Sequence, residues 1–149
     1  MELYQSSLNV EDITNRWYKE VTKMNFGAFI TFVGIIREES RIEALSFDIY
    51  KPILKSWFES WEERANRVGA KIYMAHAVGD VKIGESSYIS AVASPKRRVA
   101  LDLIDEFVED FKANAPIWKY DVIDGKRVYA KDRSTPMREA GILSEDRDD

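Results

Sequence analysis

The chain has 149 residues, of which 45% are apolar and 32% are charged, and its net charge is −4. This length and composition predict one soluble, globular domain with a substantial hydrophobic core. The negative balance argues against a general nucleic-acid or membrane-surface binder, so an anion site would need a local cluster of basic residues.

The chain contains no cysteine and a single histidine, His76. The lack of cysteine excludes a cysteine nucleophile, a disulfide framework and a thiolate metal site. One histidine argues against a histidine-based metal site or a Ser-His triad, and His76 is interpreted as a structural, partly buried residue. Because no signal pattern and no apolar run of membrane-spanning length is visible, we expect a cytoplasmic protein. The same lack of cysteine and the absence of GxGxxG and P-loop patterns lead us to expect no metal or cofactor.

Two helices and two strands are predicted in the first half of the chain. Apolar residues recur at helical spacing over residues 10–23 and predict an amphipathic helix. The apolar run GAFITFVGII (27–36) predicts a strand buried on both faces, and IEALSFDIY (42–50) alternates like a strand with one wet face. Pro52 is well placed to begin a second helix, whose apolar stripe continues to Ala65.

The second half of the chain predicts four strands and one helix. KIYMAHAV (71–78) and SSYISAVA (86–93) are typical of two strands joined by a glycine-containing loop. Ser94-Pro95 is predicted as the N-cap and first residue of a helix that Ala115-Pro116 ends. IWKYDVI and KRVYAKD flank Asp124-Gly125, which predicts a hairpin with a two-residue loop.

These elements give the order α-β-β-α-β-β-α-β-β. That order predicts one α+β domain over residues 1–133, with a mostly antiparallel sheet and packed helices. The polar residues 134–149 are predicted to form a mobile tail unless a partner holds them.

Two groups of basic residues are candidates for an anion site. Lys96, Arg97 and Arg98 fall in the first turn of a predicted helix, where free backbone N–H groups and the helix dipole favour a phosphate. Arg37 directly follows a predicted strand, and arginine in such a place suits bidentate binding of phosphate or carboxylate. From the local sequence alone, solvated side chains explain the first group equally well and are the favoured explanation for Arg37.

Lys112 and Lys119 lie seven residues apart across the Ala115-Pro116 break. The helix dipole favours a cation at Lys112, in the last turn of its helix, so a structural role suffices there. Lys119 is more informative because strands are depleted in lysine, and a two-residue hairpin loop places it opposite the small Ala130. Partial desolvation there would lower a lysine pKa towards a value useful in catalysis, while a solvated edge-strand lysine is the structural alternative.

Taken together, these segments resemble the large, catalytic subunit of molybdopterin synthase. The stretches that carry the resemblance are GAFITFVGIIR (27–37), AHAVGDVKIGE (75–85), SPKR (94–97) and FKANAPIWKYDVIDGKRVYA (111–130). The resemblance covers roughly residues 26–131 and implies an α/β-hammerhead-like fold. The spacing from Lys112 to Lys119 fits the family's lysine pair.

The resemblance also implies a reaction and its partners. Such subunits form homodimers, and each end binds a small ubiquitin-like sulfur carrier, giving a heterotetramer. The carrier's C-terminal Gly-Gly tail, charged as a thiocarboxylate, delivers sulfur twice to cyclic pyranopterin monophosphate to form the dithiolene of molybdopterin. The resemblance implies that Lys119 and Lys112 are catalytic. It further implies that Arg37, Lys96 and Arg97 bind the substrate's anionic groups, the SPKR segment reaching the site from the other subunit.

The chain departs from the family pattern in three places. Lys96 stands where family members usually have histidine, and a lysine binds phosphate but does not shuttle protons as a neutral imidazole does. The loop after Arg37 is a few residues shorter than usual. The arginine expected after the last strand is replaced near Lys131-Asp132-Arg133.

Two other classes of function fit the composition. One is a non-enzymatic dimeric module that binds a small anionic metabolite, and it would tolerate the loss of Lys119. The other is a scaffold for a ubiquitin-like partner, in which Arg37 and Arg97 would be dispensable.

Overall fold

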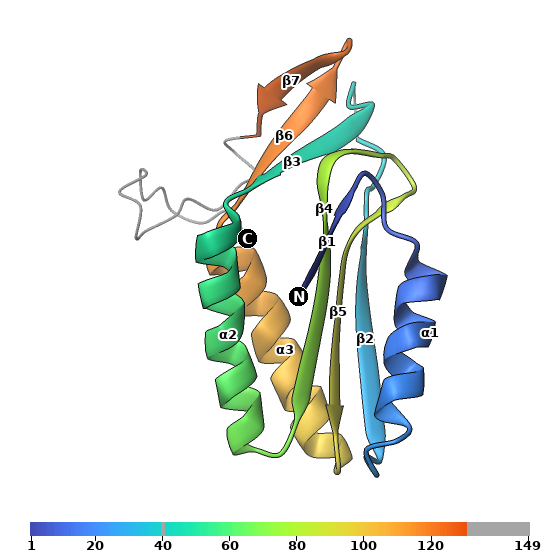
Figure 1. Cartoon of the computed structure of the whole chain (residues 1–149). Coiled ribbons are helices and arrows are strands. Elements are labelled where there is room, and N and C mark those ends of the chain that lie inside the picture. The colour runs from blue at the N-terminus through green and yellow to red at the C-terminus, as the bar shows by residue number, and fades with distance from the viewer. Residues whose placement is uncertain (40, 131–149) are drawn as a thin grey trace.

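The computed structural model describes residues 1–39 and 41–130 (Figure 1). Within these residues the chain forms three helices and a seven-stranded, largely antiparallel sheet, which confirms the predicted α+β class. The elements are β1 (Glu2–Gln5), α1 (Val10–Val21), β2 (Ala28–Ile35), β3 (Ala44–Ile49), α2 (Lys51–Arg67), β4 (Lys71–Lys82), β5 (Ser86–Ser94), α3 (Arg97–Asn114), β6 (Ile117–Ile123) and β7 (Lys126–Tyr129). The predicted tail and residues 131–133 lie outside the described residues.

Strand β4 joins two parts of the sheet, whose strand order is β2-β5-β4-β3-β6-β7. Its first half pairs with β5 at Lys71–His76, and its second half pairs with β3 at Gly79–Lys82. The strand is therefore longer than the predicted 71–78, and Gly79 takes a φ of 83° within it, a conformation that glycine adopts without strain. Beyond this point β3, β6 and β7 form a separate layer at one end of the molecule (Figure 1).

Helix α1 covers one face of the main sheet, and α2 and α3 cover the other (Figure 1). Beneath α1, the side chains of Ile13, Trp17 and Val21 enter one hydrophobic cluster. Beneath α2 and α3, a second cluster includes Leu54 and Phe107, both fully buried. Strand β5 lies between the two clusters and is buried along its whole length, as a strand covered by helices on both faces should be.

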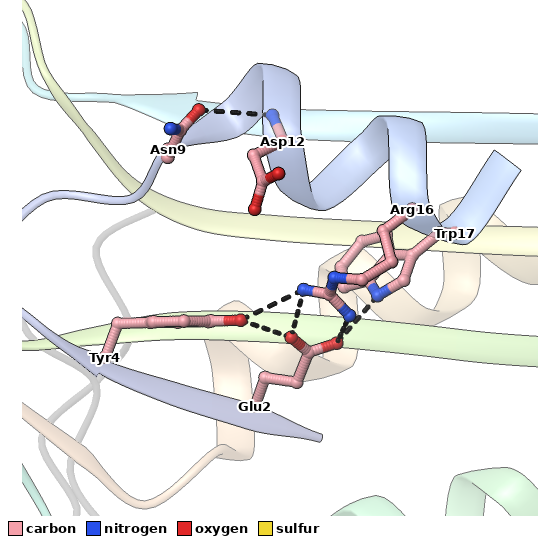
Figure 2. A network of polar contacts seen from close by, with 6 residues as sticks. All are labelled: Glu2, Tyr4, Asn9, Asp12, Arg16 and Trp17. Carbon is pink, nitrogen blue, oxygen red and sulfur yellow. Dashed lines mark hydrogen bonds and ion pairs between the residues drawn. The ribbon is translucent and has the colours of Figure 1, made fainter. Parts of the chain in front are cut away.

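Strand β1 is absent from the sequence prediction because it has only four residues and pairs in parallel with the distant β4. A polar network holds it against α1 (Figure 2). The carboxylate of Glu2 accepts hydrogen bonds from Trp17 Nε1 at 2.7 Å, Arg16 Nη2 at 2.7 Å and the Tyr4 hydroxyl. These side-chain contacts add to the backbone pairing of β1 with β4.

Two strand predictions were wrong about burial. Strand β2 was predicted to be buried on both faces, but its side chains Phe32 and Ile35 are 43% and 59% exposed. The strand lies at the edge of the sheet and pairs on one side only. Strand β3 lies inside the sheet between β4 and β6, and Ser46, expected on a wet face, is 1% exposed. A continuous apolar run indicates a strand but does not show whether its edges are paired.

The predicted start of the third helix was wrong by two residues. Helix α3 begins at Arg97, and the extended Lys96 occupies the N-cap position without a capping side chain. The Ser94 hydroxyl instead donates to the carbonyl oxygen of Lys96 at 2.5 Å. Ser94 therefore stabilises the turn that precedes the helix.

The predicted hairpin is confirmed. Asp124 and Gly125 have φ values of 49° and 72°, as the two positive φ angles of a type I′ loop require. Among the described helices, none has the length and apolar character needed to cross a membrane.

Candidate active site

Lys112 lies in the last turn of α3, near the end of the helix. Ala115 leaves the helical conformation at φ −64° and ψ 134°, as a residue before proline is expected to do. The chain then enters β6 at Ile117, so the proline break joins the two lysine-bearing elements directly. The Lys112 side chain is exposed at this junction.

Lys119 is the third residue of β6 and is half-buried. It lies opposite Phe47 of β3 on one side, and on the other its carbonyl oxygen accepts a 3.1 Å hydrogen bond from the backbone N–H of Ala130. The predicted position opposite Ala130 is therefore confirmed. Because β6 lies between β3 and β7, Lys119 is not the edge-strand lysine of the structural alternative.

The basic turn lies at the other end of α3. Lys96 and Arg97 are exposed there. From Arg97 to Lys112 the helix rises about 1.5 Å per residue, which places the two residues about 22 Å apart along its axis. Within one chain, the structure therefore does not bring the basic turn to the lysine pair.

A close backbone contact fixes this basic turn. A Cβ added to Gly27 would lie 2.7 Å from the carbonyl oxygen of Pro95, and the Gly27 N–H donates to the carbonyl oxygen of Ser94 at 3.1 Å. A glycine is needed here because the backbone of another segment passes so near.

Arg37 follows β2 at the end of the sheet opposite to the basic turn. Its side chain is 84% exposed and lies 3.5 Å from the Glu39 carboxylate. Such an exposed pair contributes little to stability, so the guanidinium can exchange this partner for another anion.

A large groove on the surface lies away from the predicted lysine and arginine residues. A groove of about 450 Å³ lies between α2 and α3, and it is lined by Ser60, Trp61, Arg64, Glu106 and Asp110. None of the predicted site residues borders it. No group of three or more histidine, aspartate or glutamate side chains within the described residues could hold a metal ion.

The comparisons with known proteins decide the family. The protein-family model described as "MoaE protein" matches residues 5–114. The chain belongs to the MoaE family. The matched region contains Arg37, Lys96, Arg97 and Lys112 and ends before Lys119.

Curated relatives of this MoaE-family chain have a common name. A molybdopterin synthase catalytic subunit of Helicobacter pylori (strain ATCC 700392 / 26695) is 46% identical over 144 residues, which is 97% of this chain and 99% of the relative. The molybdopterin synthase catalytic subunit of Dictyostelium discoideum is 30% identical over 124 residues, 76% of this chain and 75% of the relative.

Solved structures agree with the MoaE assignment. A chain in a protein–protein complex of subunits 1 and 2 of molybdopterin-converting factor from Helicobacter pylori 26695 superposes with a TM-score of 0.91 and 47% identity, covering 96% of this chain and 98% of that one. Molybdopterin synthase from Staphylococcus aureus superposes with a TM-score of 0.74 at 22% identity, covering 86% and 94% of the two chains. The second likeness shows that the fold is shared at low sequence identity.

Sequence reasoning missed two neighbours of Lys119 in this MoaE-family chain. Phe47 lies opposite Lys119 in the β3–β6 ladder, and Asp121, two residues along β6, shares its face of the sheet. The strand period alone could have identified Asp121. Phe47 could not be found in this way because it pairs with Lys119 from 72 residues away in the sequence.

Proposed function

We propose that this chain is the catalytic subunit of a molybdopterin synthase. It transfers sulfur from the thiocarboxylated Gly-Gly tail of a small ubiquitin-like carrier to cyclic pyranopterin monophosphate, building the dithiolene of molybdopterin. The observation that carries the proposal is the 46% identity over 97% of the chain to the Helicobacter pylori catalytic subunit. The likeness to a chain in a two-subunit molybdopterin-converting factor supports a small-subunit partner.

Each transfer exchanges one sulfur for one oxygen. The carrier's sulfur attacks the substrate, and a carbon–sulfur bond replaces a carbon–oxygen bond. In one transfer the departing oxygen leaves as water, and in the other it stays on the phosphate group as the cyclic ester opens. A water molecule then cleaves the acyl–sulfur bond, so the sulfur stays on the substrate and the carrier leaves as a carboxylate. Two carriers are consumed for each dithiolene, and both steps need a proton donor and a cation near the developing oxyanion.

Lys119 is the proposed general acid and base, or the cation that stabilises the tetrahedral oxyanion. Its half-buried position between β3 and β7 supports this role, because a β-sheet holds the amine more rigidly than a loop would. Lys112, at the exposed end of α3, would hold the carbonyl group of the carrier's tail or share the proton transfer.

Arg37, Lys96 and Arg97 are the proposed binding residues for the substrate's phosphate and other anionic groups. Arg37 and the basic turn lie at opposite ends of β2, since Ala28 pairs with Ser94 and Ile35 with Ser86. One small substrate cannot contact both ends within one chain. A second copy of the chain solves this problem if it places its basic turn beside the first copy's Arg37.

The edge of β2 supports such a dimer. Residues 27–36 contain no charged side chain, and Phe32 and Ile35 are among the most exposed apolar residues of the described chain. Exposed, uncharged edge strands are templates for pairing with another chain. Two β2 strands related by a two-fold axis would run antiparallel and bring Arg37 of each copy beside the Lys96–Arg97 end of the other.

Reconstitution tests the function directly. The wild-type chain, a thiocarboxylated carrier and cyclic pyranopterin monophosphate should yield the dithiolene product. Lys119→Ala should lower the rate about 100-fold or more, as expected when a group acting on the transition state is removed. Lys126→Ala is the matched control, because Lys126 is an exposed lysine on the neighbouring strand β7 and should retain full activity.

Failure would take one of two forms. No product from the wild-type chain would reject the synthase function, and tight binding of the substrate without product would favour the metabolite-binding module. Full activity of Lys119→Ala would reject the proposed mechanism alone. A cytoplasmic location belongs to the same proposal and is tested by cell fractionation.

A further inference from the structure

His76 lies in β4 at the point where this strand passes from one part of the sheet to the other. Its side chain is only 2% exposed. The imidazole meets the edge of the Phe47 ring at a centroid distance of 5.0 Å and an interplanar angle of 79°. It also contacts the Phe111 ring, at a centroid distance of 5.7 Å and an interplanar angle of 36°.

Each of these two phenylalanines adjoins one of the lysines. Phe111 directly precedes Lys112 in the last turn of α3. Phe47 is the cross-strand partner of Lys119, so their Cβ atoms lie about 5 Å apart on the same face of the sheet. His76 is therefore the middle member of a sequence of three rings that runs from one lysine-bearing element to the other. Tyr88 supports this sequence from the side, since it contacts His76 at 6.0 Å and stacks on Phe111 at 4.0 Å.

We propose that His76 is a positioning residue, whose buried ring sets the spacing between the end of α3 and strand β6 and thereby between Lys112 and Lys119. The inference rests on the proposed function insofar as it concerns catalysis. The placement of the two amines can be tested separately.

Packing explains how a ring without contact to substrate affects the lysines. Protein interiors are close-packed, so the elements on either side of a lost side chain relax towards the space that it leaves. A displacement of about 1 Å in a catalytic group can lower the rate by about 100-fold. The Ala115-Pro116 connection between the two lysine-bearing elements is short, and it would pass a shift of α3 directly to β6.

The ring is held in one orientation. Nδ1 lies 2.7 Å from the carbonyl oxygen of Ala77, which only accepts hydrogen bonds, so Nδ1 carries the proton. Burial lowers the pKa of His76 to about 4, and the hydrogen bond to Ala77 offsets this only in part. The imidazole is therefore neutral at neutral pH and acts by its shape.

Three variants separate positioning from general stability. His76→Ala removes the ring, His76→Phe keeps a ring between Phe47 and Phe111, and Met74→Ala makes a comparable truncation on the same strand. Met74 is 1% exposed and packs into the cluster beneath α2 and α3, which Phe111 also borders, but it has no ring and is not a member of the ring sequence. Each variant is compared with the wild-type chain in the reconstituted sulfur transfer, well below its own Tm.

His76→Ala should lower kcat about 30-fold or more while KM for the cyclic substrate changes less than about threefold, because the substrate-binding arginines are untouched. His76→Phe should recover most of the lost kcat, and Met74→Ala should stay within about threefold of wild type despite its lower Tm. Equal losses of kcat in His76→Ala and Met74→Ala would overturn the proposal.

A second readout does not need activity. Reductive ¹³C-methylation labels the lysines, and the signals of Lys112 and Lys119 are assigned with Lys112→Arg and Lys119→Arg. Both signals should shift in His76→Ala and neither in Met74→Ala. If the wild-type chain makes no product, the synthase function fails while these signals still test positioning. Unmoved signals in a folded His76→Ala would reject the positioning role of His76. If the alanine variant does not fold, His76→Gln takes its place in this test.

Discussion

The carboxylate of Glu2 accepts a hydrogen bond from the indole N–H of Trp17 at 2.7 Å and so fastens strand β1 to helix α1 (Figure 2). Arg16 and Tyr4 donate to the same carboxylate. The contact joins the N-terminal strand β1, which was not predicted from the sequence, to the apolar face of α1, which was predicted.

Glu2→Gln should make the chain less stable at neutral pH. Burial raises the pKa of Glu2, but hydrogen bonds from Arg16, Tyr4 and Trp17 outweigh it and lower the pKa from 4.5 to about 2. After allowance for solvent screening, the ionised carboxylate contributes about 1–2 kcal/mol to the free energy of unfolding at pH 7. Urea denaturation of both proteins at pH 7 measures the difference.

The pH dependence follows from the sign of this shift. A depressed folded pKa contributes stability in full above the unfolded value of 4.5, and the contribution is lost as the pH falls towards about 2. The gap in unfolding free energy between wild type and Glu2→Gln should therefore close between these two values. A gap that stays constant would contradict the assigned pKa.

Asp110→Ala should destabilise the contact between α2 and α3. One oxygen of Asp110 accepts hydrogen bonds from the indole N–H groups of Trp57 at 3.0 Å and Trp61 at 2.7 Å. Its loss leaves both donors without this acceptor and should cost about 2–3 kcal/mol, which chemical denaturation followed by tryptophan fluorescence can measure. Glu109→Ala, an exposed neighbour, should change stability by less than about 0.5 kcal/mol. Equal effects of the two substitutions would refute the double acceptor role.

Gly27→Ala should disturb the basic turn. The added methyl group would lie 2.7 Å from the Pro95 carbonyl oxygen, so one of the two backbones has to move. We expect a loss of about 1–3 kcal/mol in stability and a KM for the cyclic substrate raised several-fold, with little change in kcat. Gly69→Ala is the control for strain without a clash, because Gly69 has a φ of 71° but no other group lies within 4 Å of the added carbon, and its KM should not change. An unchanged KM in Gly27→Ala would separate the basic turn from substrate binding.

Ile35→Lys should weaken pairing between two copies of the chain. It places a positive charge on the exposed edge strand β2, near the Lys96–Arg97 turn of the other copy in the proposed dimer, where like charges repel. Analytical ultracentrifugation should show a dimer for wild type and mostly monomer for the variant. Val128→Lys, on the opposite edge strand β7, should remain dimeric. A wild-type monomer at micromolar concentration would reject the proposed dimer.

Mixed dimers give a second check on this arrangement. If the basic turn serves the lysine pair of the other copy, co-expression of Arg97→Ala with Lys119→Ala should restore about a quarter of wild-type activity. Half of the dimers would then be mixed, and each mixed dimer would have one intact site. Activity no higher than that of either variant alone would show that the two residues do not combine across subunits.

Local signals predicted the parts of the site that depend on neighbouring residues. Pro116 ended the helix after Lys112, and Asp124-Gly125 placed Lys119 opposite Ala130, both as the structure has them. The pairing of Lys119 with Phe47 depends on β3, which is far away in the sequence, and no local pattern encodes it. For the same reason the sequence indicated a structural, partly buried His76 but not its contacts with Phe47 and Phe111.

The edge of the sheet was predicted less well than its interior. An uninterrupted apolar run usually indicates a buried strand, yet Phe32 and Ile35 of β2 are exposed because no strand of the described chain pairs beyond them. The start of α3 was misplaced because Ser94 and Pro95 match a frequent N-cap pattern, while Ser94 bonds within the preceding turn.

The strand order has a consequence for how many neighbours the chain can hold at once. Strands β2 and β7 end the sheet on opposite sides, and within the described residues each has one paired edge. The β2 edge is apolar and uncharged, whereas β7 begins with Lys126 and Arg127. A neighbour that pairs with one edge leaves the other open, and their different chemistry favours different neighbours. The β2 and β7 edges are thus two separate pairing surfaces, each suited to a different kind of neighbour.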